Sequence, residues 1–393
     1  MEKMFVLDGD QRAILETVTR FVRDEVTPRA ASLDANKNPL DCFSWEIVEK
    51  AHELGIRTMT LDEQWGGLGV DSLTTAMVVE ELAKADLGVS VIMAQTFKIA
   101  QIMQRALNPA QRKRVLPGFA ADPRGLLAIG NTEPGNASDR YLSFPVPFAT
   151  SAERAGGGWV VNGMKQFISN GNRASHYLVA VQTDRQKTMA DGATCFLLER
   201  GQPGFTIGRV HDKMGERLAN NAELVFQDCF VPDANVVGEV GKFRAVYADF
   251  LPASNAYAGA SVLGVAVALY EKAVEWAKMR VQGGKPIIEH DGIRAQLGEM
   301  RMLIDASRSY IHRAAWLADH REQGWDATLA TLPKAMAAQV AWKIATWCME
   351  IHGGHGYMKE FGVEKLVRDA AAFLHSDGVN RTLFLKAAKD MFR

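Results

Sequence analysis

The sequence IHGGHGY at residues 351–357 is followed by VEKLVRDA at 363–370 and by HSDGVNR at 375–381. The glycine-rich turn interrupts one helical pattern, and the amphipathic segment after it ends at Asp377, directly before Gly378. Because glycine commonly follows the last residue of a helix, we expect Asp377 at a helix C-terminus. The helix dipole and apolar surroundings would both raise the pKa of this carboxyl, as suits a general base. Taken alone, the stretch fits a solvated capping carboxylate better than a general base.

The composition is that of a soluble globular protein. The chain has 393 residues, 47% of them hydrophobic and 23% charged, which is enough for about two or three domains. The formal net charge of -1 gives no electrostatic reason to expect nucleic acid or an acidic membrane surface as a partner. We see no apolar run approaching the ~18 residues of a membrane span, so no membrane association is expected.

The termini and the cysteines indicate the compartment. Residues 1–10 carry acidic side chains and no long apolar core, unlike a signal peptide. The four cysteines are far apart and form no CxxC pair, so we expect no metal site and a reducing compartment. A cytoplasmic location follows, or the mitochondrial matrix for the mature form of a eukaryotic protein.

Hydrophobic patterning divides the chain into three parts. Residues 1–122 show helical spacing, with a helix opened by Ser72 and another that Asp41 could cap. Residues 123–237 contain short β-rich runs separated by Gly, Asn and Asp, including a hairpin at 156–158. Residues 238–393 are helical again, and the small side chains of 256–268 predict a central, closely packed helix. We therefore predict an α+β fold: an N-terminal helical domain, a middle β-barrel or β-sandwich domain, and a C-terminal four-helix bundle.

Four motifs in register resemble the acyl-CoA dehydrogenase family of flavoproteins. They are NTEPGNASD at 131–139, NGMKQFISNG at 162–171, KMGER at 213–217 with its following strand, and the C-terminal stretch quoted above; Arg280 with GKPI at 284–287 is a partial fifth match. The resemblance covers nearly the whole chain. It implies a flavoenzyme that binds FAD and an acyl-CoA, a homotetramer built as a dimer of dimers, and an electron-transfer flavoprotein as the electron acceptor.

The resemblance also implies the site residues. Cofactor contacts are expected from Ile129, Asn131, Thr132, Ser138, Phe167, Ile168, Ser169, Arg280, Asp291, Glu350, Gly353, Gly354, Val379 and Arg381, and substrate contacts from Ser138, Ser254, Asn255, His375 and Gly378. In this family, the counterparts of Arg280 and of 350–354 reach the FAD of a neighbouring subunit. Asp377 falls on the position of the usual catalytic glutamate, so it would remove the α-proton while the β-hydrogen leaves as hydride to the flavin.

Departures from the family pattern leave alternatives open. Asp377-Gly378-Val379 replaces Glu-Gly-Thr, and Ser254 replaces the glutamate that some members use as the base. The polar pair His375 and Ser376 favours a short, branched, cyclic or more polar acyl group over a long chain, although His375 could instead be a capping residue. A relative with different flavin chemistry (an oxidase, a monooxygenase or a desulfinase-type enzyme) is the second possibility, which Asn255 mildly favours. A non-catalytic acyl-CoA-binding subunit is the third.

Overall fold

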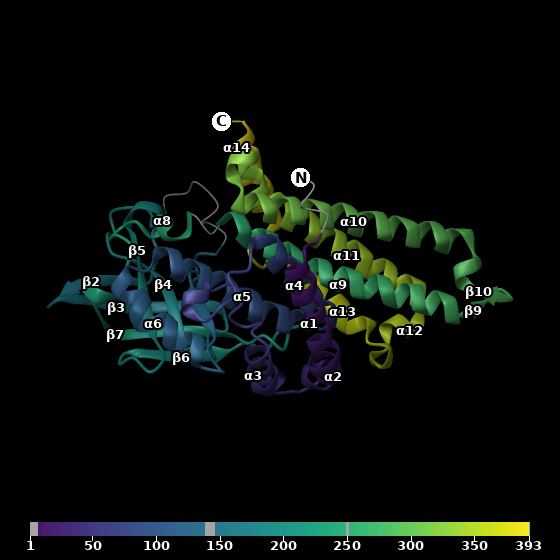
Figure 1. The fold of residues 1–393 in the computed structure, drawn as a ribbon, viewed down its shortest axis with the longest axis horizontal. Coiled ribbons are helices and arrows are strands. Elements are labelled where there is room, and N and C mark those ends of the chain that lie inside the picture. The colour runs from purple at the N-terminus through teal and green to yellow at the C-terminus, as the bar shows by residue number, and fades with distance from the viewer. Residues whose placement is uncertain (1–6, 138–145, 249–250, 393) are drawn as a thin grey trace.

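The computed structural model describes residues 7–137, 146–248 and 251–392 and shows a β domain at one end of a long helical body (Figure 1). The N-terminal helices are α1 Gly9–Phe21, α2 Thr27–Asp34, α3 Trp45–Glu53, α4 Ser72–Ala85, α5 Leu87–Ala106 and α6 Pro109–Ala121. Short polar side chains begin most of them. Asp71 caps α4 and Asp86 caps α5, as expected for residues that accept hydrogen bonds from free backbone N–H groups. Ser44, rather than the predicted Asp41, caps α3, because Asp41 lies in a preceding 3₁₀ turn.

The middle domain is a mixed sheet. Its strands are β1 Leu127–Gly130, β2 Ser151–Ala155, β3 Gly158–Ser169, β4 His176–Gln182, β5 Ala193–Glu199, β6 Phe205–Val210, β7 Asn221–Pro232 and β8 Val236–Val237, with the short helix α7 Met189–Gly192 before β5. The order is β6-β7-β3-β2-β4-β5-β8, and β1 pairs in parallel with β4. The β2–β3 hairpin turns at the predicted glycines. A bulge interrupts the β3–β7 pairing between Lys165 and Ile168, and this irregularity shapes the site described below.

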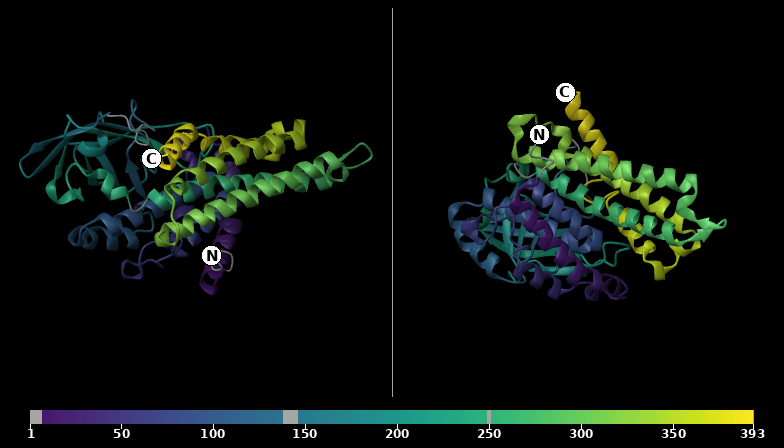
Figure 2. Two further views of the ribbon diagram at one scale, coloured as in Figure 1. Left: turned by 90° about the horizontal axis from the view of Figure 1, so that it is seen from above. Right: turned by 45° about the vertical axis from the view of Figure 1, so that its right-hand side comes forward.

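The C-terminal helices form the long axis of the molecule (Figures 1 and 2). They are α8 Phe243–Ala248, α9 Leu251–Met279, α10 Asp291–Asp319, α11 Leu332–His352, α12 Gly354–Tyr357, α13 Val363–Ala372 and α14 Asn380–Met391, with the hairpin β9 Val281–Gln282 and β10 Lys285–Pro286 between α9 and α10. As the small residues predicted, α9 is central. A Cβ at Gly264 would lie 2.3 Å from the carbonyl oxygen of Glu80, so only glycine permits this approach of α4 to α9. The predicted α+β, three-part fold is confirmed.

The hydrophobic core does not follow the three sequence segments. One continuous cluster joins residues of α1–α5 to residues of α9–α13. The two helical segments therefore share one hydrophobic core. A second cluster lies between α5, α6 and the sheet, and a third fills the sheet itself. The α9 helix is long and apolar enough to cross a membrane, contrary to our expectation that no run approaches that length, but 89% of its most apolar window is buried. Its apolarity is therefore explained by its place in the core.

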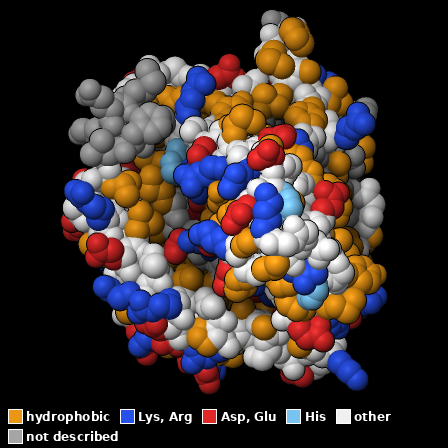
Figure 3. Space-filling model, turned by 90° about the vertical axis from the view of Figure 1, so that its right-hand side faces the viewer, with side chains coloured by type: hydrophobic (Ala, Val, Ile, Leu, Met, Phe, Trp, Pro, Cys, Tyr) orange, Lys and Arg blue, Asp and Glu red, His pale blue; other side chains and the backbone are white. Residues whose placement is uncertain are grey.

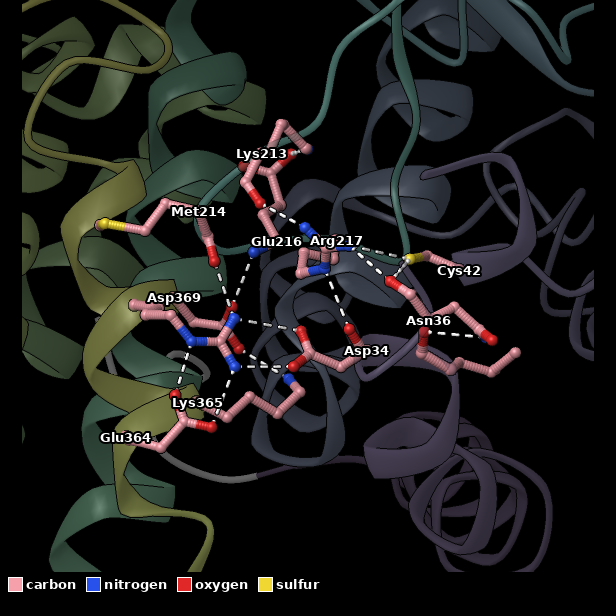
Figure 4. A network of polar contacts seen from close by, with 12 residues as sticks. Asp34, Asn36, Cys42, Lys213, Met214, Glu216, Arg217, Glu364, Lys365 and Asp369 are labelled. Atoms are coloured by element: carbon pink, nitrogen blue, oxygen red, sulfur yellow. Dashed lines mark hydrogen bonds and ion pairs between the residues drawn. The ribbon is translucent and has the colours of Figure 1, made fainter. Parts of the chain in front are cut away.

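A polar network fixes the segment 211–220 between the N-terminal helices and α13 (Figure 4). Arg368 donates to the carboxylate of Asp34 at 2.6 Å and to the carbonyl of Met214 at 2.7 Å. Asp369 accepts from the backbone N–H of Glu216 at 2.7 Å. A Cβ at Gly215 would lie 2.4 Å from the carbonyl oxygen of Arg368, so this segment lies directly against α13. It forms one side of the cavity described next.

Candidate active site

A cavity of about 590 Å³ lies between the β domain and the helical body. The β-domain side is lined by Ile129, Asn131, Thr132, Phe167, Ile168 and Ser169, and the helical side by Val91, Gln95, His375, Ser376, Asp377, Gly378 and Val379. Nearly all the residues predicted around the flavin ring and the reacting carbon therefore meet in one place. Ser138 lies outside the described residues, and Ser254, Asn255 and Arg381 do not line the cavity.

The β-domain wall is shaped by the β3 bulge and by a buried ion pair. At the bulge, Phe167 has a left-handed backbone (φ 58°) and a ring that is 54% exposed. This conformation is unfavourable for a bulky side chain and is found mainly at functional sites. Beside it, Glu133 accepts from Lys165 at 2.7 Å and from the backbone N–H groups of Ala149 and Thr150. Burial lowers the pKa of Lys165 to about 8. The pair fixes the turn that carries Asn131 and Thr132.

This wall fits the predicted cofactor. An exposed aromatic ring offers a flat surface for a planar ring system, and the hydroxyls of Thr132 and Ser169 on the same wall can form hydrogen bonds with its polar edge. The exposed ring and the two hydroxyls therefore match the shape and the polarity of a flavin. They support the placement of a flavin against Phe167, with the rest of the cavity left for a substrate.

Asp377 lies on the helical side, but its setting differs from our prediction. Helix α13 ends at Ala372, and Asp377 sits in the turn that leads to α14, with its own backbone in the left-handed region at φ 51°. Its carboxylate accepts from Lys98 of α5 at 2.7 Å. The expected helix-end, apolar setting is therefore wrong: the turn continues past the helix, and a buried cation stabilises the ionised carboxylate.

A second lysine supports the same turn from behind. Lys334 of α11 is fully buried and donates to the carbonyl of Gly378 at 2.7 Å and to the side chain of Asn380 at 2.9 Å. Burial lowers the pKa of Lys334 to about 7, and the positive charge of Lys98 acts in the same direction, whereas Asp377 opposes both. Burial, followed by the charge of Lys334, also lowers the pKa of His375, so this ring is neutral near pH 7.

Two further carboxylate residues, Asp212 and Glu216, border the cavity. Glu216 has a left-handed backbone (φ 54°) and pairs with Lys213 at 2.9 Å. Burial raises the pKa of Glu216, and the nearby carboxylates Asp369 and Asp377 add to this effect, while Lys213 opposes it. Because Lys213 and the backbone contact to Asp369 hold Glu216 in place, its carboxyl supports the cavity wall.

The other predicted residues lie elsewhere. Arg280, Glu350, Gly353 and Gly354 line a second cavity of about 440 Å³ near α12 and the β9–β10 hairpin, at the end of the helical body away from the β domain (Figures 1 and 2). Asp291 is fully exposed at the start of α10. Arg381 is exposed on α14, and Ser254 is half-buried on α9. Asn255 is buried and donates to the carbonyl of Ala330. The roles predicted for these four residues gain no support from their placement and stay predictions.

The sequence analysis missed Gln95, Lys98, Glu216 and Lys334. A signal for Lys98 was present: it is the one charged residue in the stretch VSVIMAQTFKIAQIM at 89–103, and lysine is rarely buried without a partner. A periodicity argument could not show that the partner would be Asp377, which is distant in the sequence.

Comparison with known proteins agrees with this geometry. Family models for the N-terminal, middle and C-terminal domains of acyl-CoA dehydrogenases match residues 8–122, 128–229 and 246–392. The short-chain specific acyl-CoA dehydrogenase of Megasphaera elsdenii is 33% identical over 395 residues, which cover 99% of this chain and 100% of that protein. The cyclohex-1-ene-1-carbonyl-CoA dehydrogenase of Syntrophus aciditrophicus is 31% identical, covering 97% of this chain and 89% of that protein.

Solved structures show the same similarity. Butyryl-CoA dehydrogenase from Megasphaera elsdenii superposes with a TM-score of 0.91 at 32% identity, covering 99% of this chain and 100% of that one. The FAD complex of PigA superposes with a TM-score of 0.89 at 25% identity, covering 98% of each chain. The chain belongs to the acyl-CoA dehydrogenase family. It is an FAD-dependent oxidoreductase, as the sequence motifs predicted.

Proposed function

We propose that this protein catalyses the α,β-dehydrogenation of a short, branched or cyclic acyl-CoA with Asp377 as the base. The observation that carries the proposal is the arrangement of the cavity: Asp377 lies on one wall, and Phe167 and Ser169 lie on the other. An acyl group held between them would have its α-carbon toward the carboxylate and its β-carbon toward the cofactor.

The residues of the chain account for the proton. Asp377 takes the α-hydrogen as H⁺, and Lys98 donates a hydrogen bond to its carboxylate. When bound, FAD supplies the acceptor for the β-hydrogen and its two electrons. Two C–H bonds are broken and one C=C bond is formed, so atoms and electrons balance.

The length of the base restricts the substrate. Aspartate is one methylene shorter than glutamate, about 1.5 Å, and a base must come within about 3 Å of the proton that it removes. A compact acyl group that lies deeper in the cavity meets this requirement better than a long chain. The similarity to a relative named for a cyclic substrate, cyclohex-1-ene-1-carbonyl-CoA, supports this class.

The second cavity supports an oligomer. Its residues lie apart from the first cavity, and exposed apolar side chains surround them, including Met279, Val281, Tyr357 and Met358. On the face shown in Figure 3, hydrophobic side chains lie among mixed acidic and basic ones. We propose that Arg280 and 350–354 complete the cofactor site of a neighbouring subunit in a homotetramer, and that an electron-transfer flavoprotein reoxidises the enzyme. Light scattering would report the assembly.

The variant Asp377→Asn tests the role of the base. The purified, FAD-loaded enzyme is mixed anaerobically with a panel of acyl-CoA thioesters, and loss of flavin absorbance is followed. In Asp377→Asn, we expect the rate of flavin reduction by the acyl-CoA to be about 10²–10⁴-fold lower than in the wild type. The FAD content should be unchanged. The control is Asp10→Asn on the exposed start of α1. Reduction of the Asn variant at the wild-type rate would refute the assignment.

A second candidate is an oxidase with the same fold. It is favoured by Asn255, whose amide is engaged by the carbonyl of Ala330 and is therefore directed away from a CoA contact. Reoxidation of the reduced enzyme by air within one turnover time, faster than by electron-transfer flavoprotein, would support the oxidase.

A further inference from the structure

Lys98 has hydrogen-bonding capacity that its protein partner does not use. Its ammonium group carries three N–H donors, and in the described part of the chain it makes one hydrogen bond, to Asp377 at 2.7 Å. The side chain is 96% buried. Leaving a buried N–H donor without an acceptor destabilises the folded protein by about 1–3 kcal/mol. An oxygen atom of a bound ligand could accept a hydrogen bond from these remaining N–H groups.

The position of Lys98 identifies the ligand. Residues 91, 95 and 98 lie on one face of α5 because their spacing matches the helical repeat, and Val91 and Gln95 line the cavity. Lys98 is the next residue on the same face of this helix, and its ammonium group reaches the cavity edge through its contact with the carboxylate of Asp377, which lines the cavity. Gln95, His375 and Ser376 also line the cavity, and within the described residues their side chains form no hydrogen bond with the protein. The acyl part of the cavity therefore has several unused polar groups.

We propose that Lys98, aided by Gln95, binds an uncharged oxygen acceptor on the acyl group of the substrate. The proposal rests on the proposed dehydrogenase function and narrows its substrate to an acyl-CoA with a keto or hydroxyl oxygen. Lys98 lies 2.7 Å from the carboxylate that would face the α-carbon, and its acceptor lies about 2.9 Å from the ammonium nitrogen, so the oxygen should lie within about 9 Å of that carbon. An oxygen on the γ- or δ-carbon, three or four bonds of ~1.5 Å away, is the nearest that meets this requirement without being on the reacting carbons.

An uncharged acceptor suits the charges that surround this point. The positive charge of Lys98 is already matched by Asp377, and the donors of Lys334 are engaged by Gly378 and Asn380. Burial lowers the pKa of His375, and Glu216, which also lines the cavity, is paired with Lys213. An anionic group would have to compete with Asp377 for the same ammonium.

The test compares matched substrates. Valeryl-CoA and 4-oxovaleryl-CoA differ by an oxygen on the γ-carbon, and glutaryl-CoA carries an anion at similar reach. With the FAD-loaded wild type, we expect kcat/KM for flavin reduction to be at least ~10-fold higher for 4-oxovaleryl-CoA than for valeryl-CoA, as for a hydrogen bond to a charged group. In Lys98→Met, the ratio should fall to about one. Any effect of the variant on Asp377 changes kcat/KM for both substrates equally. The ratio of the two kcat/KM values therefore reports only the contact between Lys98 and the oxygen on the γ-carbon.

The outcomes are distinguishable. Lys343→Met, on the outer face of α11, is the control and should keep the wild-type ratio. A wild-type ratio near one, or a ratio unchanged in Lys98→Met, overturns the inference and leaves the dehydrogenase function intact. A higher kcat/KM for glutaryl-CoA than for 4-oxovaleryl-CoA also overturns the inference, because Lys98 would then bind a carboxylate and not an uncharged oxygen. No flavin reduction by any acyl-CoA would instead refute the proposed function. If Lys98→Met does not fold, Gln95→Leu, which should lower the same ratio, replaces it.

Discussion

Asp369 and Asp377 belong to the same C-terminal stretch, and both pair with a lysine at 2.7 Å, yet their surroundings are opposite. Asp369 is fully buried; its oxygens accept from Lys365 and from the backbone N–H of Glu216. Lys365 in turn bonds Asp86, so α5, the 211–220 segment and α13 are joined by one network. Charges buried in this way stabilise a structure only when every partner is present.

Asp377 lies in a more open setting. Its side chain is 26% exposed at the cavity, and Lys98 retains donors that no described residue accepts. The complete network fixes the wall, and the Lys98–Asp377 pair borders the cavity. Ion pairing alone therefore does not separate the two carboxylates, whereas exposure of the carboxylate at the cavity does.

Removal of Lys365 should give the largest effect. Lys365→Met leaves Asp86 and Asp369 buried without their cation, and loss of one partner of a buried pair costs about 3–5 kcal/mol. Burial already raises the pKa of Asp86. The loss should therefore be smaller near pH 5, where a buried carboxyl can be protonated, and larger as the pH rises. Urea unfolding at several pH values measures it, with Lys386→Met, which pairs on the surface of α14, as the control at below ~1 kcal/mol. If Lys365→Met lowered the free energy of unfolding by less than ~1 kcal/mol, the Asp369 network would contribute no more to stability than a surface pair, and the distinction from the Asp377 pair would not hold.

Removal of Lys334 should give an intermediate effect whose sign depends on pH. The pKa of Lys334 is lowered to about 7 in the folded protein, so between that value and its ordinary value near 10.5 the unfolded chain binds the extra proton. The contribution of Lys334 to stability is thus full above the ordinary value and declines by about 1.4 kcal/mol per pH unit as the pH falls toward 7. Above pH 10.5, Lys334→Met should cost about 1–3 kcal/mol, because the Gly378 carbonyl loses its donor. The cost should disappear as the pH falls, and near pH 7 the variant should be more stable than the wild type. A cost that does not change with pH would contradict this account.

The sequence predicted the order of the three parts, the central α9 and the cavity residues on β1, β3 and the turn around Asp377, because these follow from local periodicity and from motifs that occur in register. It did not predict the shared core of the two helical segments, since that depends on contacts such as the approach of Gly264 to Glu80. It placed Asp377 at a helix end because an Asp-Gly pair resembles a cap, whereas α13 ends at Ala372. It missed Lys98 because the partner of a buried charge is fixed by tertiary packing.

Removal of Lys98 should have the smallest effect on stability and a specific effect on pH dependence. Lys98→Met keeps the side-chain length and leaves Asp377 in contact with the cavity, where water can solvate it, so we expect a change below ~1 kcal/mol in the free energy of unfolding. The charges near Asp377 are Lys98 from α5, Lys334 from α11, Glu216 from the 211–220 segment and the neutral His375 beside it. Lys98 is in direct contact with the carboxylate and stabilises its ionised form, so without it the proton leaves Asp377 less readily. The acid limb of the pH profile of flavin reduction should move up by ~1 pH unit in stopped-flow measurements with one acyl-CoA. An unmoved limb together with a loss of several kcal/mol would place Lys98 with Lys365, as a residue that only supports the fold.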